Sequence, residues 1–174
     1  MRILLSLIAC LITSVLAVFP DEAYQIDYHY ALLGFPQQQT TFFHQPYPNS
    51  KASLIYTLSD RGVIGAVNPK DGSLIWRQFF ASASTGRGGF LKAGQGQNTV
   101  VSAVSDIITA WSASEGRLVW ESRTRSGKIK DLEILESNTD GVKDVIAVIE
   151  HGQTYVKRLD GKTGKTLWTY ADER

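Results

Sequence analysis

Three segments of this 174-residue chain repeat one pattern, in which a short strand leads through a glycine-centred turn into a second strand that ends in tryptophan. In every copy the glycine stands four residues before the tryptophan: Gly72 and Trp76, Gly116 and Trp120, Gly164 and Trp168. The glycines are separated by 44 and then by 48 residues. A period of roughly 40–50 residues with these markers is typical of β-propeller blades or another repeat array. In such arrays the functional residues lie on the surfaces and in the loops.

The segments around these markers predict an all-β fold. Short runs rich in β-branched and aromatic residues alternate with turn signals at a spacing of about 8–12 residues. Four strands per repeat, which is the propeller count, are predicted for the second and third copies. The expected organisation is an N-terminal segment over 18–52 with a strand at 40–44, then blade 1 over 53–80, blade 2 over 81–124 and blade 3 over 125–174.

The repeated residues have structural reasons to recur. The turn glycine supplies a positive φ that other residues adopt at a cost. Asn68, Ser112 and Asp160 precede the three turns, where side-chain oxygens can accept hydrogen bonds from local N–H groups. Each tryptophan ends an outer strand, where its ring can cover the gap to a neighbouring blade while its N–H finds an acceptor. We therefore expect the tryptophans to join blades.

The first residues differ from the rest of the chain. A basic Arg2 precedes a largely apolar run over 3–18, and small residues stand at −3 and −1 of a cleavage site between Ala17 and Val18. This pattern predicts a secretory signal peptide over 1–17. The run is short for a membrane anchor, which needs about 20 apolar residues. A lipobox ending at Cys10 is the other reading, but the residues after it stay apolar where a polar tether is expected. Cys10 is the only cysteine, so we expect no disulfide in the mature chain.

The charge pattern and the motifs predict no catalytic centre. Acidic and basic residues are interspersed and the formal net charge is +1, which does not suggest nucleic-acid binding. His29, His44 and His151 are isolated in the sequence, without metal-ligand spacing. The glycine-rich stretch at 85–89 lies at no strand-to-helix junction and is a weak phosphate motif. We expect no enzyme, no catalytic residues and no cofactor other than the cation considered next.

One loop has the pattern of a calcium site. Oxygen-bearing side chains stand at positions 1, 3, 5 and 9 of residues 136–144, with glycine at position 6: Glu136, Asn138, Asp140 and Asp144. Alternating oxygen ligands around a turn glycine suit a hard cation. The other reading is a hairpin turn built on Asp-Gly, whose solvated acids need no ion. A glutamate at position 1 and the opposing charge of Lys143 favour the plain turn.

The first copy of the repeat, from Ala66 through Gly72 to Trp76, resembles the tryptophan-docking repeat of quinoprotein-like propellers. The second copy follows it with Ser112 at the third position, and the third copy follows it less closely. Two stretches, 18–28 and 58–77, also resemble the N-terminal part of the family of subunit 1 of the endoplasmic reticulum membrane protein complex. The second stretch contains the family's G-x-x-x-W-R ending.

This resemblance implies a role. It implies a non-catalytic propeller scaffold on the lumenal side of the endoplasmic reticulum membrane, in a complex that inserts transmembrane segments of client proteins. The implied partners are the other subunits of that complex and client membrane proteins, with membrane association through parts outside this chain. Three blades are too few to close a ring, so the chain is expected to be an N-terminal fragment that does not fold stably as a closed domain. The alternatives are a periplasmic quinone-dependent dehydrogenase, a bacterial outer-membrane assembly lipoprotein and the lumenal sensor domain of a stress-response kinase.

Overall fold

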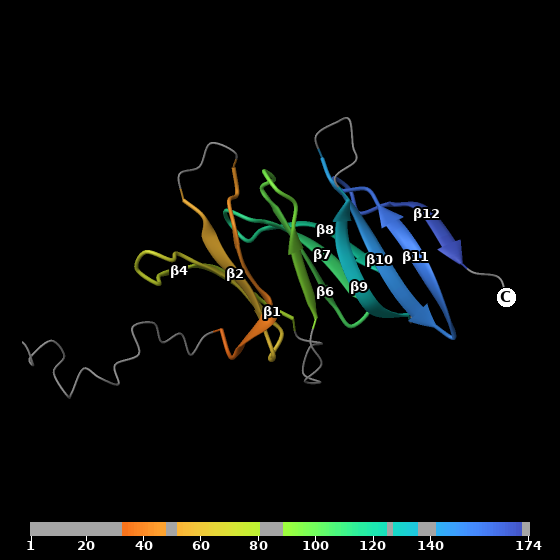
Figure 1. The fold of residues 1–174 in the computed structure, drawn as a ribbon, viewed down its shortest axis with the longest axis horizontal. Helices are drawn as coiled ribbons and strands as arrows, with labels where there is room; N and C mark the ends of the chain where they lie inside the picture. The colour runs from red at the N-terminus through yellow and green to blue at the C-terminus, as the bar shows by residue number, and fades with distance from the viewer. Residues whose placement is uncertain (1–32, 48–51, 81–88, 125–126, 136–141, 172–174) are drawn as a thin grey trace, which may run out of the picture.

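The computed structural model describes residues 33–47, 52–80, 89–124, 127–135 and 142–171. Within these residues the chain forms three four-stranded antiparallel sheets that lie next to one another (Figure 1). Each sheet is built from consecutive strands in chain order, as in a β-meander. No helix in this part of the chain is long and apolar enough to cross a membrane. The predicted all-β class with four strands per blade is confirmed.

Blade 1 contains β1 (Pro36–His44), β2 (Leu54–Ser59), β3 (Val63–Val67) and β4 (Leu74–Phe79). Blade 2 contains β5 (Phe90–Ala93), β6 (Thr99–Val104), β7 (Ile107–Ser112) and β8 (Leu118–Arg123). Blade 3 contains β9 (Lys128–Leu135), β10 (Asp144–His151), β11 (Gln153–Leu159) and β12 (Thr166–Ala171). The first strands of the blades contact one another, β1 with β5 and β5 with β9, while β4, β8 and β12 are the outermost strands.

The first sheet begins earlier than the predicted start of blade 1 at residue 53. Its strand β1 falls in the predicted N-terminal segment, and it pairs along β2 from Thr41↔Thr57 to His44↔Leu54. Residues 37–40 form a wide bulge opposite the single residue Leu58. A bulge of this length breaks the two-residue alternation by which a strand is recognised in sequence.

The core lies between the sheets rather than within a single one. One buried cluster joins blades 1 and 2 and includes Tyr56, Ile64, Trp76, Leu91 and Val100. A second cluster joins blades 2 and 3, and its buried members are Val101, Ala103, Ile108, Ala110, Trp120, Ile129, Leu132, Val145, Ala147, Ile149 and Leu159. Burial of apolar surface therefore stabilises the stacking of blades as much as the folding of each blade.

Each outer strand carries a bulge at the same place. Ala66 pairs with Trp76 while the next residue, Val67, pairs with Leu74, so Ile75 is the extra residue on β4. The same register shift makes Val119 the extra residue on β8 and Leu167 the extra residue on β12. A bulge re-aims the side chains that follow it. Here the residue that follows is the repeat tryptophan.

Candidate functional site: the docking contacts between blades

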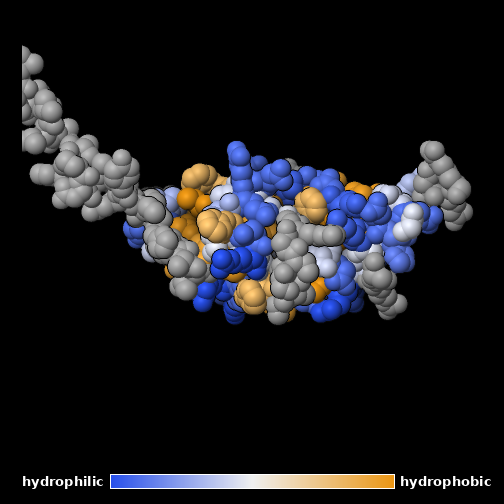
Figure 2. Space-filling view, turned by 90° about the horizontal axis from the view of Figure 1, so that it is seen from below, coloured by the Kyte–Doolittle hydropathy of each residue, from blue (hydrophilic) through white to orange (hydrophobic). Residues whose placement is uncertain are grey.

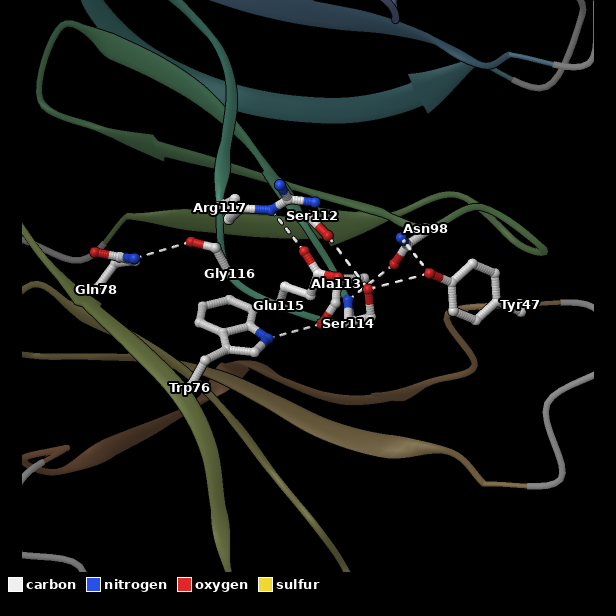
Figure 3. Close-up of polar contacts among 10 residues, drawn as sticks. All are labelled: Tyr47, Trp76, Gln78, Asn98, Ser112, Ala113, Ser114, Glu115, Gly116 and Arg117. Atoms are coloured by element: carbon white, nitrogen blue, oxygen red, sulfur yellow. Dashed lines mark hydrogen bonds and ion pairs between the residues drawn. The ribbon is translucent and has the colours of Figure 1, made fainter.

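The repeat tryptophans join consecutive blades. Trp76 of blade 1 donates its indole N–H to the carbonyl of Ala113 in blade 2 at 2.7 Å (Figure 3). Trp120 of blade 2 donates in the same way to the carbonyl of Gly161 in blade 3 at 2.9 Å. In both contacts the acceptor lies three residues before the repeat glycine of the receiving blade, so the two contacts share one geometry.

The glycine of one blade receives the tryptophan of the preceding blade. Gly116 and Gly164 both have a φ of +68°. A Cβ built on Gly116 would collide with the ring of Trp76, and a Cβ on Gly164 would collide with the ring of Trp120. The glycine thus provides the positive φ of the turn and also leaves room for the indole ring. It contacts the tryptophan of the preceding blade, whereas the tryptophan of the same repeat contacts the following blade.

Further polar contacts surround the Trp76 ring. Gln78 donates to the carbonyl of Gly116 at 2.9 Å (Figure 3). Tyr56 donates its hydroxyl to the same Ala113 carbonyl at 2.9 Å. Burial raises the pKa of the Tyr56 phenol, which keeps this donor protonated.

Polar contacts within blade 2 also link the receiving turn to the segment that follows β1 of blade 1. Asn98 accepts a hydrogen bond from the backbone N–H of Ser114 at 2.8 Å and donates to the hydroxyl of Tyr47 at 2.9 Å (Figure 3). His44 lies close by in the fold, with its Nε2 2.7 Å from the carbonyl of Gln97. The segment that follows β1 therefore reaches across to blade 2.

The expected turn contacts are present in two of the three repeats. Asn68 accepts from the backbone N–H of Lys70 at 3.0 Å, and Asp160 accepts from the N–H of Thr163 at 2.8 Å. The Thr163 hydroxyl also donates to Asp160, and these hydrogen bonds hold the pKa of that carboxyl below its usual range. Ser112 instead contacts the hydroxyl of Ser114 at 3.3 Å.

Trp168, the third repeat tryptophan, has a different environment. Its exposed fraction is 42%, against 8% for Trp76 and 6% for Trp120. Among the described residues no turn packs on it, and Leu167 and Tyr170 on the same strand are exposed as well. Within the described residues, the contact with the following blade is present at Trp76 and Trp120.

Of the four candidate calcium ligands, only Asp144 lies within the described residues, since Glu136, Asn138 and Asp140 fall in 136–141. The Asp144 side chain is 2% exposed and forms an ion pair with Arg158 at 2.6 Å. Its other oxygen accepts from the N–H of Gly161 at 3.1 Å. In the described part of the chain no group of three or more His, Cys, Asp or Glu side chains could hold a metal ion. The calcium hypothesis stays a prediction.

The Asp144–Arg158 pair was not predicted from the sequence. Arg158 stands at the position where the other copies have Ala66 and Ala110, opposite the tryptophan. The arginine in place of alanine could have predicted the pair from the sequence, because an arginine at a core position needs an acidic partner. Through Gly161, whose carbonyl receives Trp120, the pair also orders the second docking turn.

The architecture defines the class: blades with tryptophan-docking contacts make this a quinoprotein-like β-propeller structure. It resembles the quinohemoprotein alcohol dehydrogenase ADHIIG from Pseudomonas putida HK5 (TM-score 0.54, 18% identity, 79% of this chain and 22% of that chain). It also resembles a europium-containing methanol dehydrogenase (TM-score 0.51, 15% identity, 75% of this chain and 26% of that chain). At these identities the likeness shows the fold alone, and the chain spans about a quarter of the length of these two structures.

The family is identified by a comparison of the sequence with models of protein families. The family model described as the EMC1 N-terminal beta-propeller domain matches residues 17–174, so this chain belongs to that family. The predicted relationship to subunit 1 of the endoplasmic reticulum membrane protein complex is confirmed at the level of the family. A comparison with curated protein sequences returned no match.

Proposed function

We propose that this chain belongs to a non-catalytic, lumenal scaffold subunit of the endoplasmic reticulum membrane protein complex, which inserts transmembrane segments of client proteins. The family match over residues 17–174 carries the proposal. The packing is consistent with it, because the repeated residues are used in contacts between blades. The predicted signal peptide would deliver such a domain to the lumen.

The proposal is tested in cells that lack the endogenous subunit and express the full-length protein with a tag inserted among residues 48–51. The tagged protein is expected to co-purify with the other subunits of the complex and to restore insertion of a tail-anchored client. In sealed microsomes the tag is expected to resist added protease until detergent is present. A tag cleaved without detergent contradicts the lumenal location, and co-purification without rescue contradicts the role in insertion.

A pair of neighbouring substitutions tests whether the docking contact between blades 1 and 2 is needed for assembly of the complex. Trp76→Ala is expected to reduce assembly because it uncouples blade 1 from blade 2, whereas Ile75→Ala, at the neighbouring bulge residue that is 44% exposed, is expected to assemble normally. Equal assembly of the two variants would show that the seam between blades 1 and 2 does not support the partner surface.

A further inference from the structure

The first strands of the three blades are all edge strands within the described residues. Each of β1, β5 and β9 pairs with one neighbour only, β2, β6 and β10 respectively. In an antiparallel pair, alternate residues of an edge strand turn their N–H and C=O groups away from the partner. Such an edge can pair with another strand unless charge, proline, a bulge or a covering segment prevents it.

Two of these edges carry charges that oppose pairing. Strand β9 has exposed charged side chains along most of its length: Lys128, Lys130, Asp131 and Glu133. Strand β5 has four residues, and its Lys92 is tied to Glu133 of β9 by an ion pair at 2.6 Å. An additional strand on either edge would have to disturb these charged groups.

Strand β1 is protected along its first half only. It begins with Pro36, and its bulge over 37–40 is fixed by the Thr41 hydroxyl, which donates to the carbonyl of Gln37 at 2.8 Å. The remaining residues, 41–44, are in unbroken register with β2. Their sequence is Thr-Phe-Phe-His, which carries no charged side chain that protects an edge. The last of these, His44, is buried, and burial lowers its pKa.

A groove of about 770 Å³ lies along this unprotected half of β1. Thr41, Phe42 and Phe43 line it from β1, and Leu91 and Ala93 line it from β5. Phe42 is stacked on the buried Tyr56 with ring centroids 6.0 Å apart, so this wall of the groove packs against the core of blade 1. Phe43, on the opposite face of the strand, is 68% exposed. Amide side chains of Gln39, Gln45 and Gln95 also line the groove.

We propose that this groove binds an extended polypeptide segment of another protein, which adds a strand to the free edge of β1 at residues 41–44. The main-chain groups of the edge would supply the hydrogen bonds. Successive side chains of an added strand point to opposite faces. One set would therefore contact Leu91 and Ala93, and the other would contact Phe43. The partner segment is apolar or β-branched and uncharged at these positions, because the groove walls offer no charge to pair with other than Lys92, which Glu133 already holds.

The test uses the full-length protein and a fluorescent, end-blocked hexapeptide of alternating threonine and valine, followed by anisotropy. The peptide is expected to bind saturably. The same peptide, N-methylated at every second residue, is expected not to bind, because it keeps the side chains but cannot pair through its backbone. Equal binding of the two peptides, or no saturable binding of the first, overturns the proposal.

Phe43→Lys and Phe79→Lys form a matched pair, since both phenylalanines are 68% exposed but Phe79 lies on the outermost strand β4. Phe43→Lys is expected to weaken binding of the unmethylated peptide by about tenfold or more, because it removes an aromatic contact and adds an edge charge. Phe79→Lys is expected to leave binding unchanged. Equal effects of the two substitutions overturn the assignment to β1. If the peptide binds only after deletion of residues 18–32, the groove holds the chain's own N-terminal segment, and an external partner is ruled out.

Discussion

At the scale of single residues, Gly116 has two separable reasons to be glycine. Its φ is +68°, and the Trp76 ring occupies the place of a Cβ. Gly152 has a similar φ of +72°, but nothing lies within 4 Å of its Cβ position. We expect Gly152→Ala to lower the free energy of unfolding by roughly 1 kcal/mol through the backbone alone. Gly116→Ala should lower it by roughly 2–4 kcal/mol, because the ring must also move. Urea unfolding measures both, and equal losses would mean that the ring contact contributes nothing.

His44 provides a residue-scale prediction about pH. Its ring is 8% exposed, lies 5.7 Å from the Tyr56 ring and donates from Nε2 to the Gln97 carbonyl. Burial, more than any other cause, lowers the pKa of His44 below 6.5. Between pH 6.5 and the lower folded-state pKa, His44 therefore binds a proton in the unfolded chain but not in the folded chain. Stability is full above pH 6.5 and falls as pH decreases from there toward the folded-state pKa. Melting temperatures between pH 7.5 and 5 should fall less for His44→Gln than for the parent protein. Parallel pH profiles would contradict this.

At the scale of the elements, the sequence predicted the strands of blade 2 closely, because β6 and β7 are short runs rich in β-branched and apolar residues between well-marked turns. It did not predict the bulges at Ile75, Val119 and Leu167, because a bulge is defined by register against a neighbouring strand. The signal was the adjacent apolar pair of each outer strand, which a simple alternation does not allow: Ile75 and Trp76, Val119 and Trp120, Leu167 and Trp168. The acceptor carbonyls of the docking contacts were likewise unpredictable, since backbone groups leave no trace in composition.

The turn of blade 3 depends on a charged pair between two strands. Asp144 on β10 is 2% exposed, and Arg158 on β11 is 26% exposed. Asp144→Ala removes the carboxylate that pairs with Arg158 and accepts from the Gly161 N–H. We expect a loss of roughly 2–4 kcal/mol in unfolding free energy, reduced from the fully buried case because Arg158 reaches solvent. Asp131→Ala on β9 is the control: its exposed carboxylate accepts a hydrogen bond from the adjacent Leu132 N–H at 2.8 Å, so its loss should cost less than the loss of the Asp144 carboxylate. Similar losses for both would contradict the special role of the pair.

At the scale of the whole molecule, two interfaces with the same tryptophan contact join the three blades, and blades 1 and 3 both carry exposed large apolar side chains among the described residues. Blade 3 exposes Trp168, Leu167 and Tyr170, and blade 1 exposes Phe43 and Phe79. On the face drawn in Figure 2, apolar residues gather toward the end of the molecule that carries blade 1, and the blade 3 end is more hydrophilic. Exposed apolar area of this kind marks surfaces that contact other parts of an assembly.

Tryptophan fluorescence can test this arrangement of interfaces and exposed side chains. The chain has four tryptophans, and Trp168 is 42% exposed whereas Trp120 is 6% exposed. In the 174-residue chain, Trp168→Phe should remove most of the emission that acrylamide quenches, and Trp120→Phe should leave that fraction unchanged. Equal effects of the two substitutions would mean that the seam between blades 2 and 3 does not form in this chain alone. In the full-length protein, loss of quenching at Trp168 would indicate that the face of blade 3 is covered there, as the faces of blades 1 and 2 are covered by the blades that follow them.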